Sequence, residues 1–234
     1  MSVLHIALVP AAGSGSRFGA TAPKQYTDLL GQPLLRHAIA RLARHPRIDR
    51  VVVVLSPDDT RFAGLDLSDL RPIVDARACG GPTRAASVLA GLRSLAGEVA
   101  ADDWILVHDA ARPCLPAAVI DRLVATLADD AVGGIAALPV ADTLKRADTD
   151  ARIDATVPRD GLWAAQTPQM FRFGVLLEAL EHADLDHVTD EAGAVEARGL
   201  APRLVEGDPA NLKVTYPRDL ALAAHLLAAM EDLP

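Results

Sequence analysis

Cysteine and aromatic side chains are scarce in this chain of 234 residues. Its two cysteines, Cys79 and Cys114, have no C-x-x-C spacing, so the sequence carries no zinc or redox signature and suggests no disulfide framework. We expect both to be buried thiols. With only four Phe, two Trp and two Tyr, the hydrophobic core must be built from Ala, Val, Leu and Ile.

Excess positive charge and long apolar runs are also lacking. The formal net charge is −8 and no dense Lys/Arg run occurs, which disfavours binding to duplex nucleic acid or to an anionic membrane. No segment reaches the roughly 20 apolar residues that span a bilayer, and the N-terminus lacks the basic region of a secretory signal. The sequence predicts a cytoplasmic protein with no nucleic-acid or membrane partner, in which local cations must hold any anionic ligand.

Short β-branched runs alternate with helical patterns along most of the chain. This alternation predicts an α/β fold with a Rossmann-like, mostly parallel sheet and helices on both faces, and ligands then bind beyond the carboxyl ends of the strands. No repeat or linker divides the chain, so we expect a single domain over 1–234. The expected strands are 3–9, 51–55, 104–108, 132–138 and 202–206, and the expected helices are 33–45, 84–95, 116–128, 173–183, 191–198 and 219–230.

Residues 139–166 break the alternation. Strand-like runs flank D-T-D at 148–150 and again flank Asp160-Gly161, and both are hairpin turn signals. We interpret this segment as an inserted β-arm, which is too small to bury a core by itself and is therefore expected to pack on a partner subunit. An ordinary flexible excursion is the alternative.

The first expected strand ends in a loop of small residues that is followed at once by two cations. Gly13 and Gly15 let the backbone approach a ligand closely, and free N–H groups in such a turn form an anion-binding concavity. A tight turn would explain the glycines but not Arg17 and Lys24 so soon after them. The glycine spacing of this loop matches neither the dinucleotide-binding motif nor the Walker motif. The combination favours a polyphosphate site.

Two further stretches carry candidate ligand-binding residues. C-G-G-P-T-R-A-A-S at 79–87 is either a helix start capped by Thr83 or a second ligand wall with Arg84 and Ser87, and the two interpretations are equally supported.

V-H-D-A-A-R-P at 107–113 places Asp109 at a strand's carboxyl end, where it is a candidate Mg²⁺ ligand because Mg²⁺ takes one or two carboxylates plus substrate phosphates. An Asp109–Arg112 pair that holds the turn is the alternative. We expect His108 to be a packed strand residue rather than a ligand.

The ordered set of motifs resembles the 2-C-methyl-D-erythritol 4-phosphate cytidylyltransferases of the non-mevalonate isoprenoid pathway, over essentially the whole chain. The glycine loop and the Pro-Lys pair alone recur across sugar-nucleotide pyrophosphorylases. The complete set is P-A-A-G-x-G-x-R at 10–17, P-K-Q-Y at 23–26, G-G-x-x-R-x-x-S-V-x-x-G-L at 80–92, V-H-D-A-A-R-P at 107–113, D-T-x-K-R at 142–146, R-x-G-L-W at 159–163, T-P-Q at 167–169, T-D-E-A at 189–192 and N-x-K-V-T at 211–215.

The resemblance implies a nucleotidyltransferase of the nucleotide-diphospho-sugar transferase fold type. In it, the phosphate of 2-C-methyl-D-erythritol 4-phosphate attacks the α-phosphorus of CTP in line, without a protein nucleophile. It further implies a homodimer that forms through the arm, so that Thr143 and Arg159 reach the partner's site.

The resemblance also assigns roles to residues. Arg17 and Lys24 would stabilise charge on the α-phosphate and the departing pyrophosphate, and Asp109 would help to hold Mg²⁺ or another divalent cation that binds mainly through the CTP phosphates. The implied nucleotide-binding residues are Ala11, Ala12, Gly13, Gly15, Gly81, Arg84 and Ser87. The implied substrate-binding residues are Asp109, Arg112, Thr143, Arg159, Thr167 and Lys213, of which Arg159 and Lys213 join Arg17 and Lys24 as catalytic.

One departure and two rival functions accompany this interpretation. Pro82 stands where many relatives have a residue with a backbone N–H, so one possible contact to the base or ribose is missing or moved. A ribitol 5-phosphate cytidylyltransferase is the nearest rival, and a non-catalytic nucleotide-binding protein is the rival from another class. A dehydrogenase is excluded by the glycine spacing and by the lack of an acidic residue at the end of the second strand.

Overall fold

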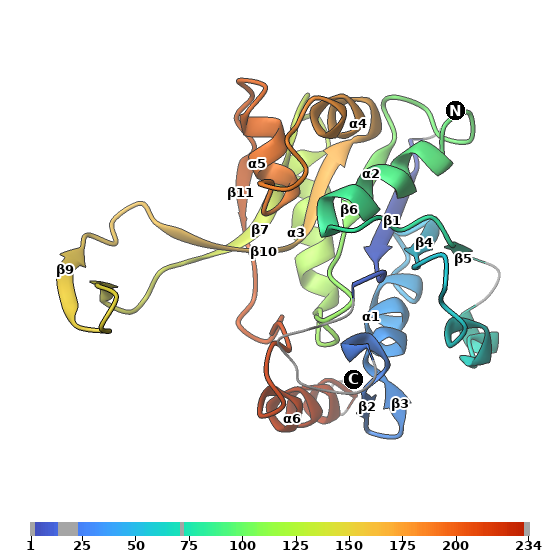
Figure 1. Ribbon diagram of the computed structural model, residues 1–234. Coiled ribbons are helices and arrows are strands. Elements are labelled where there is room, and N and C mark those ends of the chain that lie inside the picture. The colour runs from blue at the N-terminus through green and yellow to red at the C-terminus, as the bar shows by residue number, and fades with distance from the viewer. Residues whose placement is uncertain (1–2, 14–22, 71–72, 232–234) are drawn as a thin grey trace.

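A seven-stranded sheet with the strand order β11-β7-β10-β6-β1-β4-β5 forms the centre of the computed structural model, which describes residues 3–13, 23–70 and 73–231 (Figure 1). All its strands run parallel except β10, which pairs antiparallel with β6 on one side and β7 on the other. The strands are β1 (His5–Pro10), β4 (Arg50–Val54), β5 (Val74–Arg77), β6 (Trp104–Val107), β7 (Gly133–Pro139), β10 (Trp163–Arg172) and β11 (Arg203–Glu206).

Helices cover both faces of this sheet, as the sequence predicts. They are α1 (Leu34–Ala43), α2 (Arg84–Ser94), α3 (Ala117–Leu127), α4 (Phe173–Glu181) and α5 (Glu191–Glu196). A further helix, α6 (Asp219–Glu231), packs apart from the faces of the sheet. A small hairpin, β2 (Asp28–Leu29) with β3 (Gln32–Pro33), precedes α1, and short 3-10 turns occur at Lys24–Tyr26, Phe62–Gly64 and Ser68–Leu70. The α/β fold class and the predicted order of these helices are confirmed.

The core consists of two apolar layers, one on each face of the sheet. Alternate residues of β1 enter different layers: Ala7 and Val9 pack with α1 and α3, whereas Ile6 and Leu8 pack with α2, α4 and α5. This alternation follows from the period of two along a strand. A third cluster joins α6 to the β2–β3 hairpin and to Val214. Among the described residues, no helix is both long and apolar enough to cross a membrane.

Two sheet strands escape the sequence prediction. β5 is a short edge strand, Val-Asp-Ala-Arg, whose half-exposed polar residues conceal it. β10 is a long strand whose first half the sequence pattern assigns to the arm. It pairs through Trp163–Ala165 with Ala137–Pro139 of β7, so the excursion from the sheet covers 140–162 and not 139–166.

The excursion contains one hairpin rather than two. β8 (Leu144–Ala147) pairs with β9 (Ile153–Val157) beyond the body of the molecule (Figure 1). The D-T-D signal is confirmed, because the Asp148 carboxylate accepts the N–H groups of Asp150 and Arg152 in this turn. The Asp160-Gly161 turn joins β9 to β10, which do not pair with each other, so the second hairpin prediction is wrong. That the arm packs on a partner subunit stays a prediction.

The two cysteines differ in burial. Cys114 is fully buried, and burial raises the pKa of its thiol to about 11. Cys79 is only partly buried, although burial raises the pKa of its thiol too. The expectation of a buried thiol is therefore met at Cys114 and only partly at Cys79.

Gly91 lets α2 lie close against the sheet. A Cβ atom at this position would meet Val54 Cγ2 at 2.5 Å and Leu8 Cδ1 at 3.0 Å. Val54 belongs to the stiff β-branched class and cannot turn away cheaply. We expect Gly91→Ala to lower the free energy of unfolding by about 1–3 kcal/mol, because overpacking outweighs the gain in helix propensity. Urea denaturation measures this, with Gly64→Ala, where a Cβ meets nothing within 4 Å, as the control. A Gly91→Ala protein as stable as the parent would contradict the tight packing.

Candidate active site

The predicted ligand loops meet at the carboxyl ends of β1, β5 and β6, around a pocket of about 210 Å³ that we call the first pocket. Lys24 and Lys213 reach it from outside the sheet, from the turn before β2 and the loop after β11. The predicted residues that line it are Ala11, Ala12, Gly13, Lys24, Gly81, Arg84, Ser87, Asp109 and Lys213. Gly15 and Arg17, which the sequence also assigns to this site, lie outside the described residues.

Hydrogen bonds within the protein shape the wall of the first pocket. Thr83 caps α2 by accepting the Ala86 N–H, and Ser87 Oγ accepts the Gly81 N–H at 3.1 Å. The helix-cap interpretation of 79–87 is therefore confirmed. Gly81, Arg84 and Ser87 line the pocket, and the ligand wall stays a prediction. Ala11 donates its N–H to the Val54 carbonyl, and its own carbonyl accepts from Gln25 Nε2 at 2.7 Å. The N–H groups of Ala11 and Gly81 are thus already paired within the protein and are not free for a ligand.

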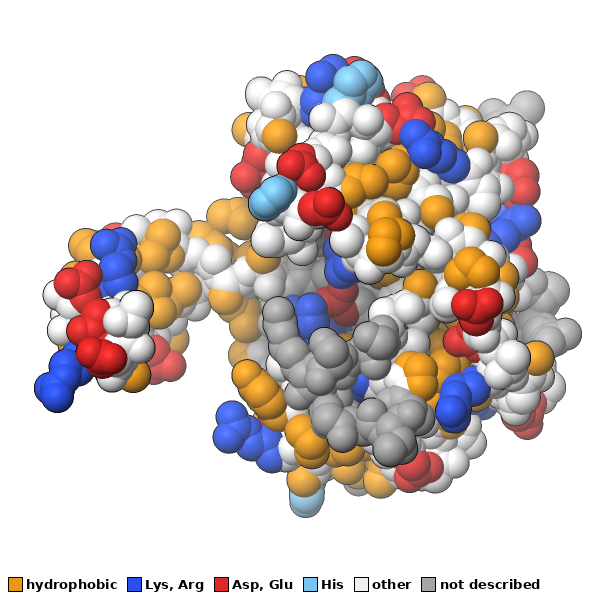
Figure 2. Space-filling model, viewed as in Figure 1, with side chains coloured by type: hydrophobic (Ala, Val, Ile, Leu, Met, Phe, Trp, Pro, Cys, Tyr) orange, Lys and Arg blue, Asp and Glu red, His pale blue; other side chains and the backbone are white. Residues whose placement is uncertain are grey.

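A second pocket of about 200 Å³ adjoins the first. Arg84, Asp109 and Lys213 line both pockets, so the Asp109 carboxylate lies where the two meet. The second pocket also contains Arg112 and Thr167 of the predicted set, together with Ala165, Gln166, Gln169, Thr189 and Asp190. Figure 2 shows Lys or Arg side chains beside an acidic one in the hollow at the centre of the displayed face. A larger cavity of about 640 Å³, between α1 and α6, contains none of the predicted residues.

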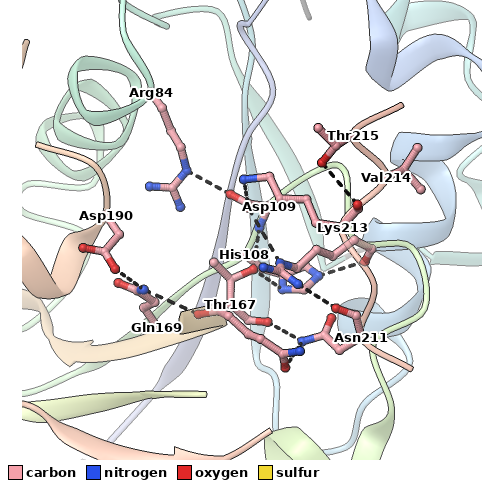
Figure 3. Close-up of polar contacts among 12 residues, drawn as sticks. Arg84, His108, Asp109, Thr167, Gln169, Asp190, Asn211, Lys213, Val214 and Thr215 are labelled. Atoms are coloured by element: carbon pink, nitrogen blue, oxygen red, sulfur yellow. Dashed lines mark hydrogen bonds and ion pairs between the residues drawn. The ribbon is translucent and has the colours of Figure 1, made fainter. Parts of the chain in front are cut away.

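Asp109 is held between cations (Figure 3). Arg84 Nε donates to its Oδ1 at 2.9 Å, Lys213 Nζ lies 2.8 Å from Oδ2, and Arg112 Nε lies 3.8 Å from Oδ2. Burial alone would raise the pKa of Asp109, but the positive charges of Arg84, Lys213 and Arg112 outweigh it and hold that pKa well below the ordinary value. The carboxylate is therefore ionised throughout the physiological range.

Arg112 is buried and its guanidinium is only partly satisfied. Nη1 donates to the Asn211 carbonyl at 2.6 Å, whereas Nε has no hydrogen-bond partner. An unpaired buried donor carries a desolvation penalty that an anionic ligand would relieve. Lys24 Nζ donates to the Val214 carbonyl at 2.7 Å at the edge of the first pocket.

His108 connects this site to β10. It is fully buried, and burial lowers its pKa to about 4, so the ring is neutral at pH 7. Its Nε2 lies 3.0 Å from the Arg112 carbonyl, which can only accept, so Nε2 carries the proton. Nδ1, at 3.0 Å from Thr167 Oγ1, must then accept the threonine hydroxyl proton. His108 is a packed residue at the strand end, as predicted.

Both the hydroxyl group and the carbonyl group of Thr167 are hydrogen-bonded within the protein. Its Oγ1 donates to His108 and accepts the Asp109 N–H at 3.0 Å, while Asn211 Nδ2 donates to its carbonyl at 2.6 Å. Pairing between β10 and β7 shifts register from Ala165 to Gln169, which takes Thr167 out of the ladder and toward Asp109.

The sequence interpretation missed the residues that support Arg84 from α5. Glu191 is fully buried and accepts from Arg84 Nη1 at 2.6 Å and Nη2 at 3.0 Å. Asp190 caps α5, and Gln169 bonds both Asp190 and the Ala192 N–H. The available signal was T-D-E-A at 189–192, an acidic pair at the start of a short helix of small residues.

Thr143 and Arg159 are not brought into the site of their own chain. Both are exposed in the excursion at 140–162, and neither lines either of the two pockets. Arg159 donates to the Ala141 carbonyl within the same segment.

The donor set fits a divalent cation that arrives with an anionic ligand rather than a resident ion. Among the described residues, no group of three or more His, Cys, Asp or Glu side chains could hold a metal. Asp109 is the one carboxylate among the described residues that line the first pocket. Because Mg²⁺ keeps waters and combines one or two carboxylates with substrate phosphates, a single carboxylate in the pocket is compatible with it.

Fold and site together define an α/β protein with two adjoining pockets at the carboxyl ends of its parallel strands, which share one carboxylate. The sequence model of the family described as IspD, 2-C-methyl-D-erythritol 4-phosphate cytidylyltransferase, matches residues 5–229. The chain therefore belongs to the IspD family.

Individual relatives agree over nearly the whole chain. The chain is 64% identical to the 2-C-methyl-D-erythritol 4-phosphate cytidylyltransferase of Dechloromonas aromatica (strain RCB), across 96% of this chain and 98% of that one. A crystal structure of a 4-diphosphocytidyl-2C-methyl-D-erythritol synthase superimposes with a TM-score of 0.86 at 44% identity, covering 97% and 99% of the two chains. The corresponding cytidylyltransferase of Francisella tularensis gives a TM-score of 0.81 at 31% identity, covering 95% and 99%.

The buried neutral His108 predicts a pH dependence of stability. Its folded-state pKa of about 4 lies below the ordinary value of 6.5. As the pH falls from 6.5 to 4, the unfolded chain therefore binds a proton at this residue that the folded chain does not bind. This contribution to stability is complete above about pH 6.5 and is lost toward pH 4, with a loss of about 2 kcal/mol between pH 7 and pH 5.

Urea denaturation of the ligand-free protein at the two pH values measures this loss. The His108→Gln protein should lose less stability between pH 7 and pH 5 than the parent by about that amount, whereas exposed His182 provides a control, His182→Gln, that keeps the parent's dependence. Equal losses for the parent and His108→Gln would show that His108 is not held neutral.

Proposed function

We propose that this chain transfers a cytidylyl group from CTP to 2-C-methyl-D-erythritol 4-phosphate, giving 4-diphosphocytidyl-2-C-methyl-D-erythritol and pyrophosphate. Membership of the family and the names of its relatives support this reaction. The observation that carries it in the structure is the Asp109 carboxylate, shared by two cation-lined pockets. One pocket suits the nucleotide and the other the polyol phosphate, so that the two phosphates meet beside Asp109.

The reaction needs positioning and charge stabilisation rather than a protein nucleophile. An oxygen of the substrate phosphate forms a bond to the α-phosphorus of CTP, the bond from that phosphorus to the bridging oxygen breaks, and pyrophosphate leaves with the electron pair. Lys24 lies in the first pocket and Lys213 in both, where they can neutralise charge on the α-phosphate and the leaving group. Arg17, outside the described residues, is proposed to join them.

A divalent cation, Mg²⁺ or a similar ion, would neutralise and orient the CTP phosphates when bound. Asp109, whose carboxylate faces Lys213, is the protein residue that would hold it. Release of Lys213 from this carboxylate would free its ammonium for phosphate.

In the second pocket, Arg112 would bind the phosphate group of the polyol phosphate, and Thr167 would bind one of its hydroxyl groups. Arg112 Nε, which has no hydrogen-bond partner within the protein, would donate to the phosphate. Because the Thr167 hydroxyl proton is committed to His108, Thr167 can accept a hydrogen bond from a substrate hydroxyl but cannot donate one to a phosphate oxygen. These two residues together suit a ligand that carries both a phosphate and a hydroxyl group.

Pyrophosphate release with CTP and Mg²⁺ tests the proposed reaction, with 2-C-methyl-D-erythritol 4-phosphate and ribitol 5-phosphate offered in parallel. We expect release to depend on the methylerythritol phosphate. Preference for ribitol 5-phosphate would show that the proposed substrate is wrong and that the cytidylyl transfer itself is right. Release with neither would contradict the transferase and favour a nucleotide-binding protein.

Lys24 should matter for turnover rather than for folding. Lys24→Ala is expected to lower kcat by ~10²-fold or more, the order seen when one preorganised stabiliser of transition-state charge is removed. Arg93→Ala is the matched control, since it removes one positive charge from an exposed pair with Glu181 that lines neither pocket. Steady-state kinetics measure kcat of the parent and of both variants, after thermal unfolding has shown that the variants fold like the parent. A loss of only a few fold would remove Lys24 from the catalytic role.

We further propose that the chain forms a homodimer through the arm and that Thr143 and Arg159 complete the partner's site. Their exposure away from both pockets supports this, as do the exposed apolar side chains of Ile153, Leu162 and Trp163 on and beside the arm. A site built from one chain alone would leave two predicted substrate residues without a function.

Mixed dimers test the shared site. Arg159→Ala and Lys24→Ala chains are each expected to be weakly active, and an equal mixture reassociated from separated subunits should recover about a quarter of the parent activity, because half the dimers are mixed and each has one intact site. The control replaces the Lys24→Ala chain with a chain that carries both substitutions and cannot rebuild a site. Without recovery above that control, each site would lie within one chain.

A further inference from the structure

The cavity of about 640 Å³ between α1 and α6 is separate from the candidate active site. None of the residues that line it also lines the first or the second pocket. Its volume lies within the range of small-molecule sites, which is about 300–1,000 Å³. We call it the helix cavity, and the reaction proposed above gives it no role.

One face of α1 and the residues just after it supply the helix cavity with basic side chains. His37, Arg41 and His45 follow one another at intervals of four residues, Arg36 and Arg44 lie two turns apart, and all five line the cavity. A cation near the C-terminus of a helix is favourable by itself, because it opposes the helix dipole. This effect accounts for Arg41 and Arg44 but not for Arg36, which lies in the first turn.

The carboxylates beside these cations are already engaged. Asp69 Oδ1 lies 2.6 Å from Arg36 Nη2, and its Oδ2 lies 2.7 Å from Arg44 Nη2. Asp121 is the one carboxylate among the described residues that line the helix cavity, and it pairs with Arg47, which does not line it. Neither carboxylate therefore pairs with the remaining arginine of the cavity.

That arginine is Arg41. It is partly buried, and within the ranges that the structure describes it forms no hydrogen bond or ion pair. A guanidinium presents a planar set of donors that matches the oxygens of a phosphate or a carboxylate. An unpaired guanidinium in the wall of a cavity, in a chain whose net charge is −8, favours an anionic ligand.

The rest of the wall is largely apolar. Ala40, Leu115 and Leu227 are buried residues that line the helix cavity. Leu30 also lines it, yet this side chain is 56% exposed and its backbone has a φ of 56°. A leucine in the left-handed region is strained, and a glycine would take this conformation without cost. A ligand with a hydrocarbon part would cover Leu30, whereas an inorganic anion would leave this wall unused.

We propose that the helix cavity binds a small organic anion that carries a hydrocarbon part. Arg41 holds the anionic group, with Arg36 and Arg44 beside it, and the hydrocarbon part lies against Leu30 and Leu227. This site is additional to the proposed function and does not rest on it.

Calorimetric titration with octyl phosphate tests the site without CTP and without turnover. Arg41→Gln should raise the Kd by about 10-fold or more, because it removes charge-assisted hydrogen bonds to the anion. Arg93→Gln makes the same change in an exposed pair with Glu181, outside the lining of the helix cavity, and should leave the Kd unchanged. Equal Kd values for the parent and Arg41→Gln, or no saturable binding to the parent, would overturn the proposal.

Two simpler ligands separate the contributions of charge and hydrocarbon. Octanol retains the hydrocarbon part and inorganic phosphate retains the charge, so each should bind at least about 10-fold more weakly than octyl phosphate. Octanol that binds as tightly as octyl phosphate would show that the cations take no part. Inorganic phosphate that binds as tightly would show that the apolar wall takes no part, and either result would overturn the proposed ligand class.

Leu30→Asp keeps the proposal testable if Arg41→Gln does not fold, because Leu30 is exposed. A carboxylate at this position repels the anion and removes apolar contact, so the Kd for octyl phosphate should rise by about 10-fold or more. An unchanged Kd in this variant would overturn the proposal.

A crystal structure with octyl phosphate locates the bound molecule. The phosphate is expected within hydrogen-bond distance of Arg41, with the alkyl chain against Leu227. Octyl phosphate found only in the first or the second pocket would overturn the proposal. The outcome is independent of the proposed transferase, because a protein that transfers nothing can still bind at the helix cavity, and an active one can fail to.

Discussion

The ion pairs around Asp109 are the contact on which the rest of the site depends. The carboxylate stands at the end of β6, and Arg84 from α2 and Lys213 from the loop after β11 converge on it. Its backbone N–H is bonded to Thr167 of the antiparallel β10. A buried carboxylate is tolerated only when charge and hydrogen bonds compensate its desolvation, so the same interactions that keep Asp109 ionised also define the boundary between the pockets.

The sequence predicts the parts of the candidate site that follow β1 and β6 and the helix cap before α2, but not the strand β5 that precedes Gly81. Ala11 to Gly13, Gly81 and Asp109 each follow a parallel strand, and parallel strands bring their carboxyl ends to one edge of the sheet. Small residues, a helix cap and an acid at these positions are recognisable from local pattern. The motifs that carry the family resemblance add Lys24 and Lys213, whose place in the site depends on chain paths that no local pattern shows.

The features that the sequence does not predict depend on contacts between residues far apart in the chain. The antiparallel direction of β10 was hidden because its first half reads as part of the hairpin-rich segment, although it pairs with β7 across the base of the excursion. Glu191 looks like an ordinary charged residue near a helix start, and only the fold reveals that it is buried against Arg84. Thr143 and Arg159 show the opposite case, since the sequence identifies them but one chain does not bring them to the pockets.

The most direct test of the account is a crystal structure with the product, 4-diphosphocytidyl-2-C-methyl-D-erythritol, because one molecule must then span both pockets. The account predicts cytidine against Ala11, Gly81 and Ser87, the polyol beside Arg112 and Thr167, and the diphosphate between them near Asp109 and Lys213. A product bound elsewhere, or cytidine in the second pocket, would contradict the central claim that the two substrates meet at Asp109.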